Sequence, residues 1–184
     1  MEKYKVTIEG TSPILFSNPI GMIPQHFGKK SVPTPEEEAA TRCYWLDGPG
    51  SELCFPSDNL KIALIQASSA YRFGKQSLAP FVAGSILLQP ALLGLGTNKY
   101  FIDTRRAVVQ RQGVLRSRPR LNEWKLSFEI IQDDDFPEQA SSQLPLIIAE
   151  AGRRIGIGDY RPQKKGWFGK FRLIEFDGRP YTSN

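Results

Sequence analysis

Histidine and cysteine are almost absent from this chain of 184 residues, which holds only His26, Cys43 and Cys54. Two cysteines are too few for a disulfide framework or a zinc site. They flank a turn-like segment at 46–51 and are candidates to face each other across a hairpin, but we expect two reduced thiols. A single histidine argues against most histidine-based and metal-dependent catalytic schemes.

Long apolar runs are also missing. No stretch reaches the roughly 18 apolar residues of a transmembrane helix. Residues 1–4 lead directly into an alternating segment instead of an apolar signal region, which favours a cytoplasmic protein. The length fits a single domain over residues 1–184, large enough to bury a core without metal or disulfide bonds. We expect no cofactor, no metal and no membrane partner.

Alternating apolar and polar residues predict two strands. Residues 3–10 (KYKVTIEG) and 124–131 (WKLSFEII) each place every second side chain on one apolar face. An apolar segment predicts a core strand around 85–88, and the last strand is expected at 170–176. The sheet is therefore expected to have four main strands.

Two main helices and one short helix are predicted between these strands. Ser57 is expected to be the N-cap of the first, which has apolar residues at helical spacing and ends at Gly74. The second covers 142–154, with Pro145 tolerated in its first turn. A short helix is expected at 35–40. The order strand, helix, strand, strand, helix, strand predicts an α+β fold with a ferredoxin-like (RRM-like) βαββαβ core.

Two insertions, at about 11–55 and 96–121, interrupt this order. Residues 11–35 are rich in Pro, Gly, Ser and Asn and predict a long surface loop. The second insertion predicts an Arg-rich extended hairpin around Gln112-Gly113. Connections of this length inside a compact domain are usually functional or disordered.

The charge of the chain is strongly segregated. The formal net charge is only +5, from 24 Lys+Arg and 19 Asp+Glu. However, residues 98–125 and 151–172 each carry +6, so the other 134 residues carry −7. The side chains in these stretches that we expect to contact nucleic acid are Arg105, Arg106, Arg111, Arg116, Arg118, Arg120, Arg153, Arg154, Arg161, Lys164, Lys165, Trp167, Phe168 and Lys170.

The residue types in these stretches favour single-stranded nucleic acid as the partner. Six of the eight cations in the first stretch are Arg, whose planar fork matches phosphate oxygens and stacks on bases. The second mixes cations with Gly156, Gly158, Gly166 and Gly169 and with the aromatic residues Tyr160, Trp167 and Phe168. Glycine lets the backbone approach a phosphate closely and offer its N–H groups, and exposed aromatic rings stack on bases. The alternative is an ordinary solvated face, with the Arg residues only protecting a sheet edge.

Residues 54–64 (CFPSDNLKIAL), through Pro56, Ser57, Leu60 and Lys61, resemble the turn that opens the first helix in the RAMP superfamily (repeat-associated mysterious proteins of CRISPR effectors). Residues 11–15 (TSPIL) are similar to the turn after its first strand. Residues 156–171 (GIGDYRPQKKGWFGKF) resemble its C-terminal Gly-rich loop. The Arg-rich hairpin stands where the backbone subunits carry a thumb.

The resemblance implies a non-catalytic RNA-binding subunit of a CRISPR-like effector complex in antiviral defence. Such a subunit assembles head-to-tail in several copies along a guide RNA, beside other effector subunits and a target DNA or RNA. Ser57, Asn59 and Lys61 would then meet phosphate at the helix start. For Ser57 the plain alternative is a helix N-cap.

Two other functions stay open at this point. One is a guide-processing endoribonuclease of the same superfamily, for which the first insertion offers His26, Glu36 to Glu38 and Asp47. The other is a phage single-stranded DNA-binding protein. We assign no catalytic residue, because no acid–base pair, nucleophile motif or metal cluster can be identified. Asp133-Asp134-Asp135 is interpreted as a solvated turn.

Overall fold

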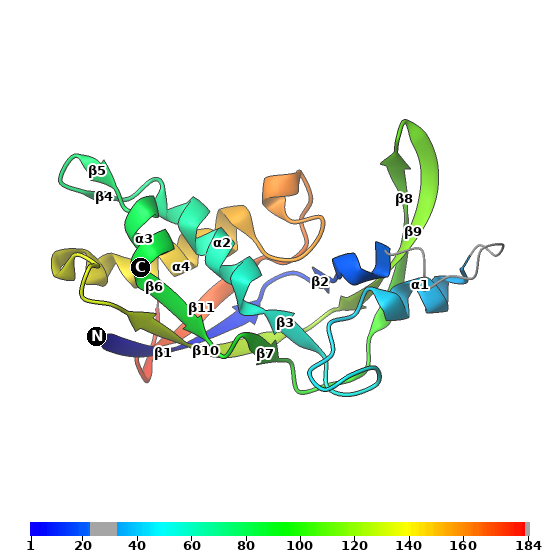
Figure 1. Cartoon of the computed structure of the whole chain (residues 1–184), viewed down its shortest axis with the longest axis horizontal. Helices are drawn as coiled ribbons and strands as arrows, with labels where there is room; N and C mark the ends of the chain where they lie inside the picture. The colour runs from blue at the N-terminus through cyan, green and yellow to red at the C-terminus, as the bar shows by residue number, and fades with distance from the viewer. Residues whose placement is uncertain (23–32, 183–184) are drawn as a thin grey trace.

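The computed structural model describes residues 1–22 and 33–182. These residues form an α+β architecture of antiparallel sheets and four α-helices. Figure 1 shows a body of sheet and helices with one long hairpin, β8–β9, projecting from it. No helix in the described ranges is both long and apolar enough to span a bilayer.

A five-stranded antiparallel sheet forms the base of the body. Its order is β12 (Arg179–Pro180), β11 (Phe171–Phe176), β1 (Glu2–Gly10), β10 (Lys125–Gln132) and β6 (Ile86–Gln89). Every neighbouring pair runs antiparallel. The four strands predicted from the sequence are therefore confirmed, and the short β12 adds an edge.

The alternation of the sequence sets which face of this sheet is buried. Val6 and Ile8 of β1 lie beside Phe128 and Leu126 of β10, and all four are buried. Successive side chains of a strand point to opposite faces. The polar residues between them therefore lie on the open face.

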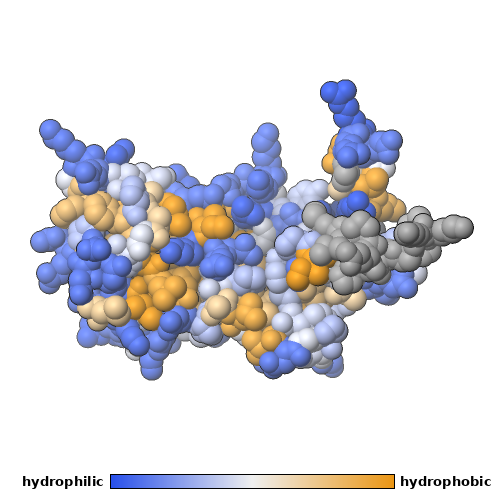
Figure 2. Space-filling model, in the orientation of Figure 1, coloured by the Kyte–Doolittle hydropathy of each residue, from blue (hydrophilic) through white to orange (hydrophobic). Residues whose placement is uncertain are grey.

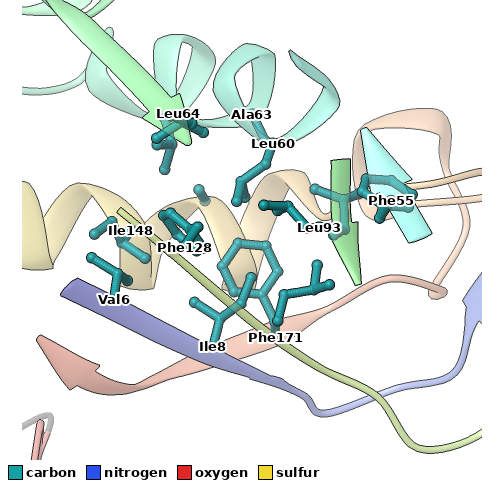
Figure 3. Close-up of a cluster of buried hydrophobic side chains, with 14 of the residues drawn as sticks. Val6, Ile8, Phe55, Leu60, Ala63, Leu64, Leu93, Phe128, Ile148 and Phe171 are labelled. Carbon is teal, nitrogen blue, oxygen red and sulfur yellow. The ribbon is translucent and has the colours of Figure 1, made fainter. Parts of the chain in front are cut away.

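Helices α2 (Ser57–Ser68) and α4 (Leu144–Glu150) cover the buried face, and α3 (Ala79–Ser85) packs on α2 (Figure 1). Figure 3 shows the core between the two layers, where Leu60 and Leu64 of α2 approach the strands. Burial of these aliphatic and aromatic side chains provides the main stabilisation of the body.

The first main helix differs from its prediction at both ends. Pro56 is the N-cap, whereas Ser57 is the first helical residue and makes no capping hydrogen bond. The predicted N-cap at Ser57 is therefore wrong. The helix ends at Ser68 and not at Gly74, which lies at φ +59° in the turn between β4 (Arg72–Phe73) and β5 (Gln76–Ser77).

The second main helix is composite. A 3₁₀ segment (Glu138–Gln143) leads into α4, and a π-helical turn (Ala151–Ile155) follows it. The predicted position of Pro145 in the first turn of α4 is confirmed. The π turn brings the backbone at Gly152 against β11.

The first insertion is more ordered than expected. Residues 14–16 are fully buried, and Ile14–Leu15 form strand β2. A 3₁₀ turn follows at Pro19–Met22, and α1 covers Pro35–Thr41. The predicted surface loop over 11–35 is thus wrong for its first third, because these apolar residues pair with the second insertion.

The second insertion is a long hairpin, as predicted. Strands β8 (Phe101–Val109) and β9 (Gln112–Leu121) pair with each other, and β9 also pairs with β2. The turn is at Gln110-Arg111, both at positive φ, and not at Gln112-Gly113. A two-residue turn with positive φ at both positions suits the twist of a hairpin.

A small sheet joins the body to the hairpin. Strand β3 (Cys54–Pro56) pairs with β7 (Leu92–Gly94), which the sequence did not predict. Cys43 and Cys54 are both buried free thiols, which confirms the expected absence of a disulfide bond. Burial raises the pKa of Cys43 to about 12, so this thiol stays protonated and unreactive at neutral pH.

We expect Gly152→Ala to destabilise the protein. A β-carbon at this residue would lie 2.1 Å from the Phe171 carbonyl oxygen, and overpacking of this kind costs about 1–3 kcal/mol. Gly84→Ala is the matched control, because a β-carbon there meets no atom within 4 Å. Urea unfolding should show a lower free energy of unfolding for Gly152→Ala only. Equal values for the two variants would contradict the packing of the π turn.

Candidate nucleic-acid interface

Four arginines lie on one face of the projecting hairpin. In the register of β8 and β9, Arg105 lies opposite Arg116, and Arg118 and Arg120 follow at every second residue of β9. A period of two places these side chains on the same side of the ribbon. Arg106 lies on the opposite face, and Arg111 is at the turn.

The Gly-rich loop, residues 156–169, packs against this arginine face. The Arg105 guanidinium lies 4.7 Å from the centre of the Phe168 ring, and the Arg118 guanidinium lies 5.1 Å from that of Tyr160. Arg118 Nε is also 2.7 Å from an Asp159 carboxylate oxygen. The two basic stretches, separated in the sequence, therefore form one continuous surface.

The glycines of this loop serve packing more than ligand contact. A β-carbon at Gly166 would lie 1.7 Å from the Tyr160 carbonyl oxygen, and one at Gly169 would lie 1.7 Å from that of Ile157. Their N–H groups already donate within the chain, that of Gly169 to Pro13 at 2.7 Å. The expectation that these N–H groups are offered to a phosphate is therefore wrong for Gly166 and Gly169.

Asp103 organises the base of the arginine face. It is 7% exposed and accepts hydrogen bonds from Arg105 at 2.5 Å and from Arg120 at 3.0 Å. Burial alone would raise the pKa of Asp103, but the two guanidinium groups outweigh it and hold the pKa below its usual value. The carboxylate is thus ionised at neutral pH and fixes both arginines.

Helix α1 supplies a second acidic support. Glu38 is 7% exposed, and its carboxylate accepts hydrogen bonds from Arg116 at 3.4 Å and from the Ser117 N–H at 2.9 Å. Burial lowers the pKa of nearby Arg42, and the charges of Arg116 and Arg118 lower it further. Glu38 also caps the edge of β9 where β2 ends, which limits pairing by another strand.

Seven of the predicted cations make no ion pair within the described part of the chain, and two of these are Lys61 and Arg161. Arg106 and Arg111 are exposed near the tip of the hairpin. Lys164, Lys165 and Lys170 belong to the Gly-rich loop or adjoin it, and the first two are exposed. These groups have the most donors available for an incoming phosphate.

The two aromatic candidates of the loop have different environments. Trp167 is 54% exposed, whereas Phe168 is 1% exposed and lies between Arg105 and Trp167, with the two aromatic ring centres 4.5 Å apart. Phe168 thus offers no free face, which corrects its prediction as a base-stacking residue. Trp167 keeps a surface on which a base can stack.

The three residues predicted to contact phosphate at the start of α2 have different environments in the structure. Ser57 is buried, and its N–H donates to the Ala91 carbonyl, so its predicted phosphate contact is wrong. Asn59 lines a cavity between α2 and the Gly-rich loop, where Arg161 also lies. Lys61 is partly buried on α2 and makes no ion pair among the described residues.

Within the described residues, Arg153 and Arg154 form ion pairs away from the interface. Both pair with Glu150, at 2.5 Å and 2.8 Å, and both side chains are well exposed on the π turn. None of their ion pairs within the described ranges reaches the hairpin or the Gly-rich loop. We therefore centre the candidate interface on β8–β9 and on residues 156–170.

Some of the residues considered for catalysis have structural roles in the described part of the chain. Glu37 forms a capping box with Thr34 at the start of α1. Asp133 accepts a hydrogen bond in the predicted turn, and Asp47 is exposed. His26 lies outside the described residues. Across residues 1–22 and 33–182, no three His, Cys, Asp or Glu side chains are grouped to hold a metal ion.

In the sequence, the two acids that organise this surface are each isolated among cations. Asp159 is the single acid of the second basic stretch, and Asp103 is the single acid between Lys99 and Arg120. A lone carboxylate among many cations is placed to hold several of them. Arg42 had no comparable signal, because its neighbours come from distant segments.

Comparison of the chain with models of known protein families gave no match. A search of curated protein sequences also gave no match. Function is therefore inferred from the residues of the chain and their geometry.

We expect Asp103→Asn to reduce stability near pH 7 by about 1–3 kcal/mol, because Arg105 and Arg120 lose their shared charge partner. The lowered pKa of Asp103 stabilises the fold above the unfolded value of about 3.9. This stabilisation is lost as the pH falls through the folded pKa.

Unfolding of wild type and variants between pH 7 and pH 2 measures this effect. The wild type should lose more stability on acidification than Asp103→Asn. Exposed Asp47→Asn serves as the control and should follow the wild type within about 0.5 kcal/mol. Parallel curves for wild type and Asp103→Asn would contradict the role of this carboxylate.

Proposed function

We propose that this protein is a non-catalytic RNA-binding subunit that assembles in several copies along a guide RNA in a CRISPR-like effector complex. The observation that carries the proposal is the packing of the Gly-rich loop onto the arginine face of the hairpin. The arginine face and the loop thereby form one surface that combines arginines, lysines and an exposed tryptophan. Together these groups suit the backbone and unstacked bases of a single strand.

We further propose that the body is a ferredoxin-like core. The strand order β11-β1-β10-β6, antiparallel throughout, supports this assignment. In the chain, α2 lies between β1 and β6, and α4 lies between β10 and β11. Two split βαβ units have this arrangement. The hairpin then belongs to the connection between the second and third core strands.

Single-stranded RNA fits the surface better than duplex DNA. The cations are distributed over a two-stranded ribbon and a loop, not along a helix placed to enter a major groove. The open face of the main sheet carries Lys5, Thr7, Ser127 and Glu129, which are polar and of mixed charge. Stacking is therefore expected at Trp167 and not on the open sheet.

The far face of the hairpin supports assembly of several copies. Val108 is 71% exposed and Leu115 is 69% exposed, and both lie on the face opposite Arg105, Arg116, Arg118 and Arg120, beside Arg106. Figure 2 shows hydrophobic as well as hydrophilic surface on this projecting arm. Exposed apolar side chains on a protruding element are typical of contacts between proteins. A head-to-tail contact of this kind repeats into an open filament.

We expect Arg106→Glu/Arg111→Glu to weaken binding of single-stranded RNA, because both side chains are exposed and make no ion pair in the described part of the chain. A loss of roughly tenfold per residue follows if each contact contributes about 1.4 kcal/mol. The slope of log Kd against log salt should fall by about 0.7 per lost contact. Fluorescence anisotropy at several salt concentrations measures both quantities.

Arg72→Glu/Lys75→Glu is the matched control, with the same change of charge on the β4–β5 hairpin, which lies at the other end of the molecule (Figure 1). It should alter the affinity by less than the hairpin variant. Equal losses would show only a general charge effect. Tighter binding of DNA than of RNA at matched salt would favour the single-stranded DNA-binding alternative.

We expect assembly on RNA to depend on the apolar face of the hairpin. On strands of increasing length, the mass of the wild-type complex should rise in steps as copies are added. Val108→Ser/Leu115→Ser should bind RNA as single copies, whereas Leu146→Ser, at an exposed leucine on α4, should assemble normally. Mass photometry measures the steps. Stepwise assembly of the hairpin variant would exclude this contact.

A further inference from the structure

A cavity lies between helix α2 and the Gly-rich loop, beside the arginine face. Its volume is about 220 Å³, and its wall includes Tyr44, Phe55, Asn59, Gln66, Asp159 and Arg161. Pockets for drug-sized ligands begin at about 300 Å³. A cavity of this size fits one planar ring system better than a whole nucleotide.

Gln66, a residue of the wall, carries a polar atom without a hydrogen-bond partner in the described part of the chain. Gln66 Oε1 is buried and accepts no hydrogen bond from the described residues. A buried acceptor without a hydrogen-bond donor lowers the stability of the fold by about 1–3 kcal/mol. The environment of the Gln66 amide oxygen therefore requires an explanation. A donor supplied by a bound ligand would satisfy it.

The rest of the wall combines polar and apolar groups. Asp159 holds Arg118 at 2.7 Å, and Arg161 Nη1 donates to the Gly158 carbonyl at 3.0 Å. Tyr44 and Phe55 add aromatic surface, with ring centres 6.2 Å apart in an edge-on arrangement. Hydrogen-bonding side chains around an apolar floor are the usual environment of an unstacked base.

The place of the cavity links it to the proposed RNA path. Asp159 belongs both to the cavity wall and to the ion pair with Arg118. A phosphate held at the arginine face would therefore lie beside the wall of the cavity, with a base on the same backbone close to it.

We propose that this cavity binds a single unstacked nucleobase of the bound strand, with the Gln66 amide hydrogen-bonding its edge. The inference rests on the proposed function, because the base is delivered by a strand bound at the arginine face. It adds a hydrogen bond to the edge of a base, beside the backbone contacts of the cations and the stacking expected at Trp167.

The test compares an oligouridine with an abasic ribose-phosphate strand of the same length by fluorescence anisotropy at one salt concentration. Wild type should bind the oligouridine at least about tenfold more tightly, since stacking contributes about 1–3 kcal/mol per base. Gln66→Leu should reduce this ratio severalfold and leave binding of the abasic strand unchanged. Gln76→Leu, at an exposed glutamine on β5, should behave as wild type.

The possible outcomes separate the two proposals. If the strand with bases and the abasic strand bind equally, or if Gln66→Leu keeps the wild-type ratio, the base-binding cavity is excluded while RNA binding stands. If neither strand binds to wild type, the proposed function fails and the inference fails with it. Thermal unfolding of Gln66→Leu shows whether the variant is folded before binding is compared.

Discussion

The contact between the Gly-rich loop and the arginine face of the hairpin is the interaction on which the proposed interface depends. Arg118 meets both Asp159 and Tyr160, and Arg105 lies over Phe168. These contacts are charge-assisted and partly shielded from water, where they are stronger than at an open surface. They fix a projecting ribbon against a loop that also contacts β2. Strand β2 adds to this link, because it pairs with β9 and its Leu15 carbonyl accepts a hydrogen bond from the Asp159 N–H.

The same contacts decide which positive charges remain available. Asp103, Glu38 and Asp159 together hold Arg105, Arg116, Arg118 and Arg120 in place. These acids lower the net charge of the surface but align the guanidinium groups, so that less entropy is lost when a phosphate binds. Among the cations without an ion pair in the described ranges, Arg106 and Arg111 lie near the hairpin tip and Lys164 and Lys165 lie in the loop. A bound nucleic-acid strand would thus meet aligned arginines at the base of the hairpin, and cations without an ion pair at the hairpin tip and in the loop.

The sequence predicted the elements whose pattern is local. Strands β1 and β10 follow from strict alternation, and the hairpin follows from a polar, Arg-rich stretch around Gly113. The turn was misplaced because Gly113 serves another purpose: the Arg106 side chain crosses its backbone, and a β-carbon there would lie 2.6 Å from Arg106 Nε. Burial of Phe168 was also missed. It depends on Arg105, which is distant in sequence, and no local pattern encodes such a contact.

The two insertions become one structural unit once their pairing is considered. Strand β2 of the first insertion hydrogen-bonds to β9 of the second, and Glu38 of α1 continues that edge by accepting from Ser117. A two-stranded ribbon alone is only marginally stable in water. A third strand and a buried carboxylate at its base explain how this hairpin can project from the body and keep its arginines in register. The first insertion is therefore a support for the second, and Glu38, one of the acids considered at first for catalysis, has this structural role.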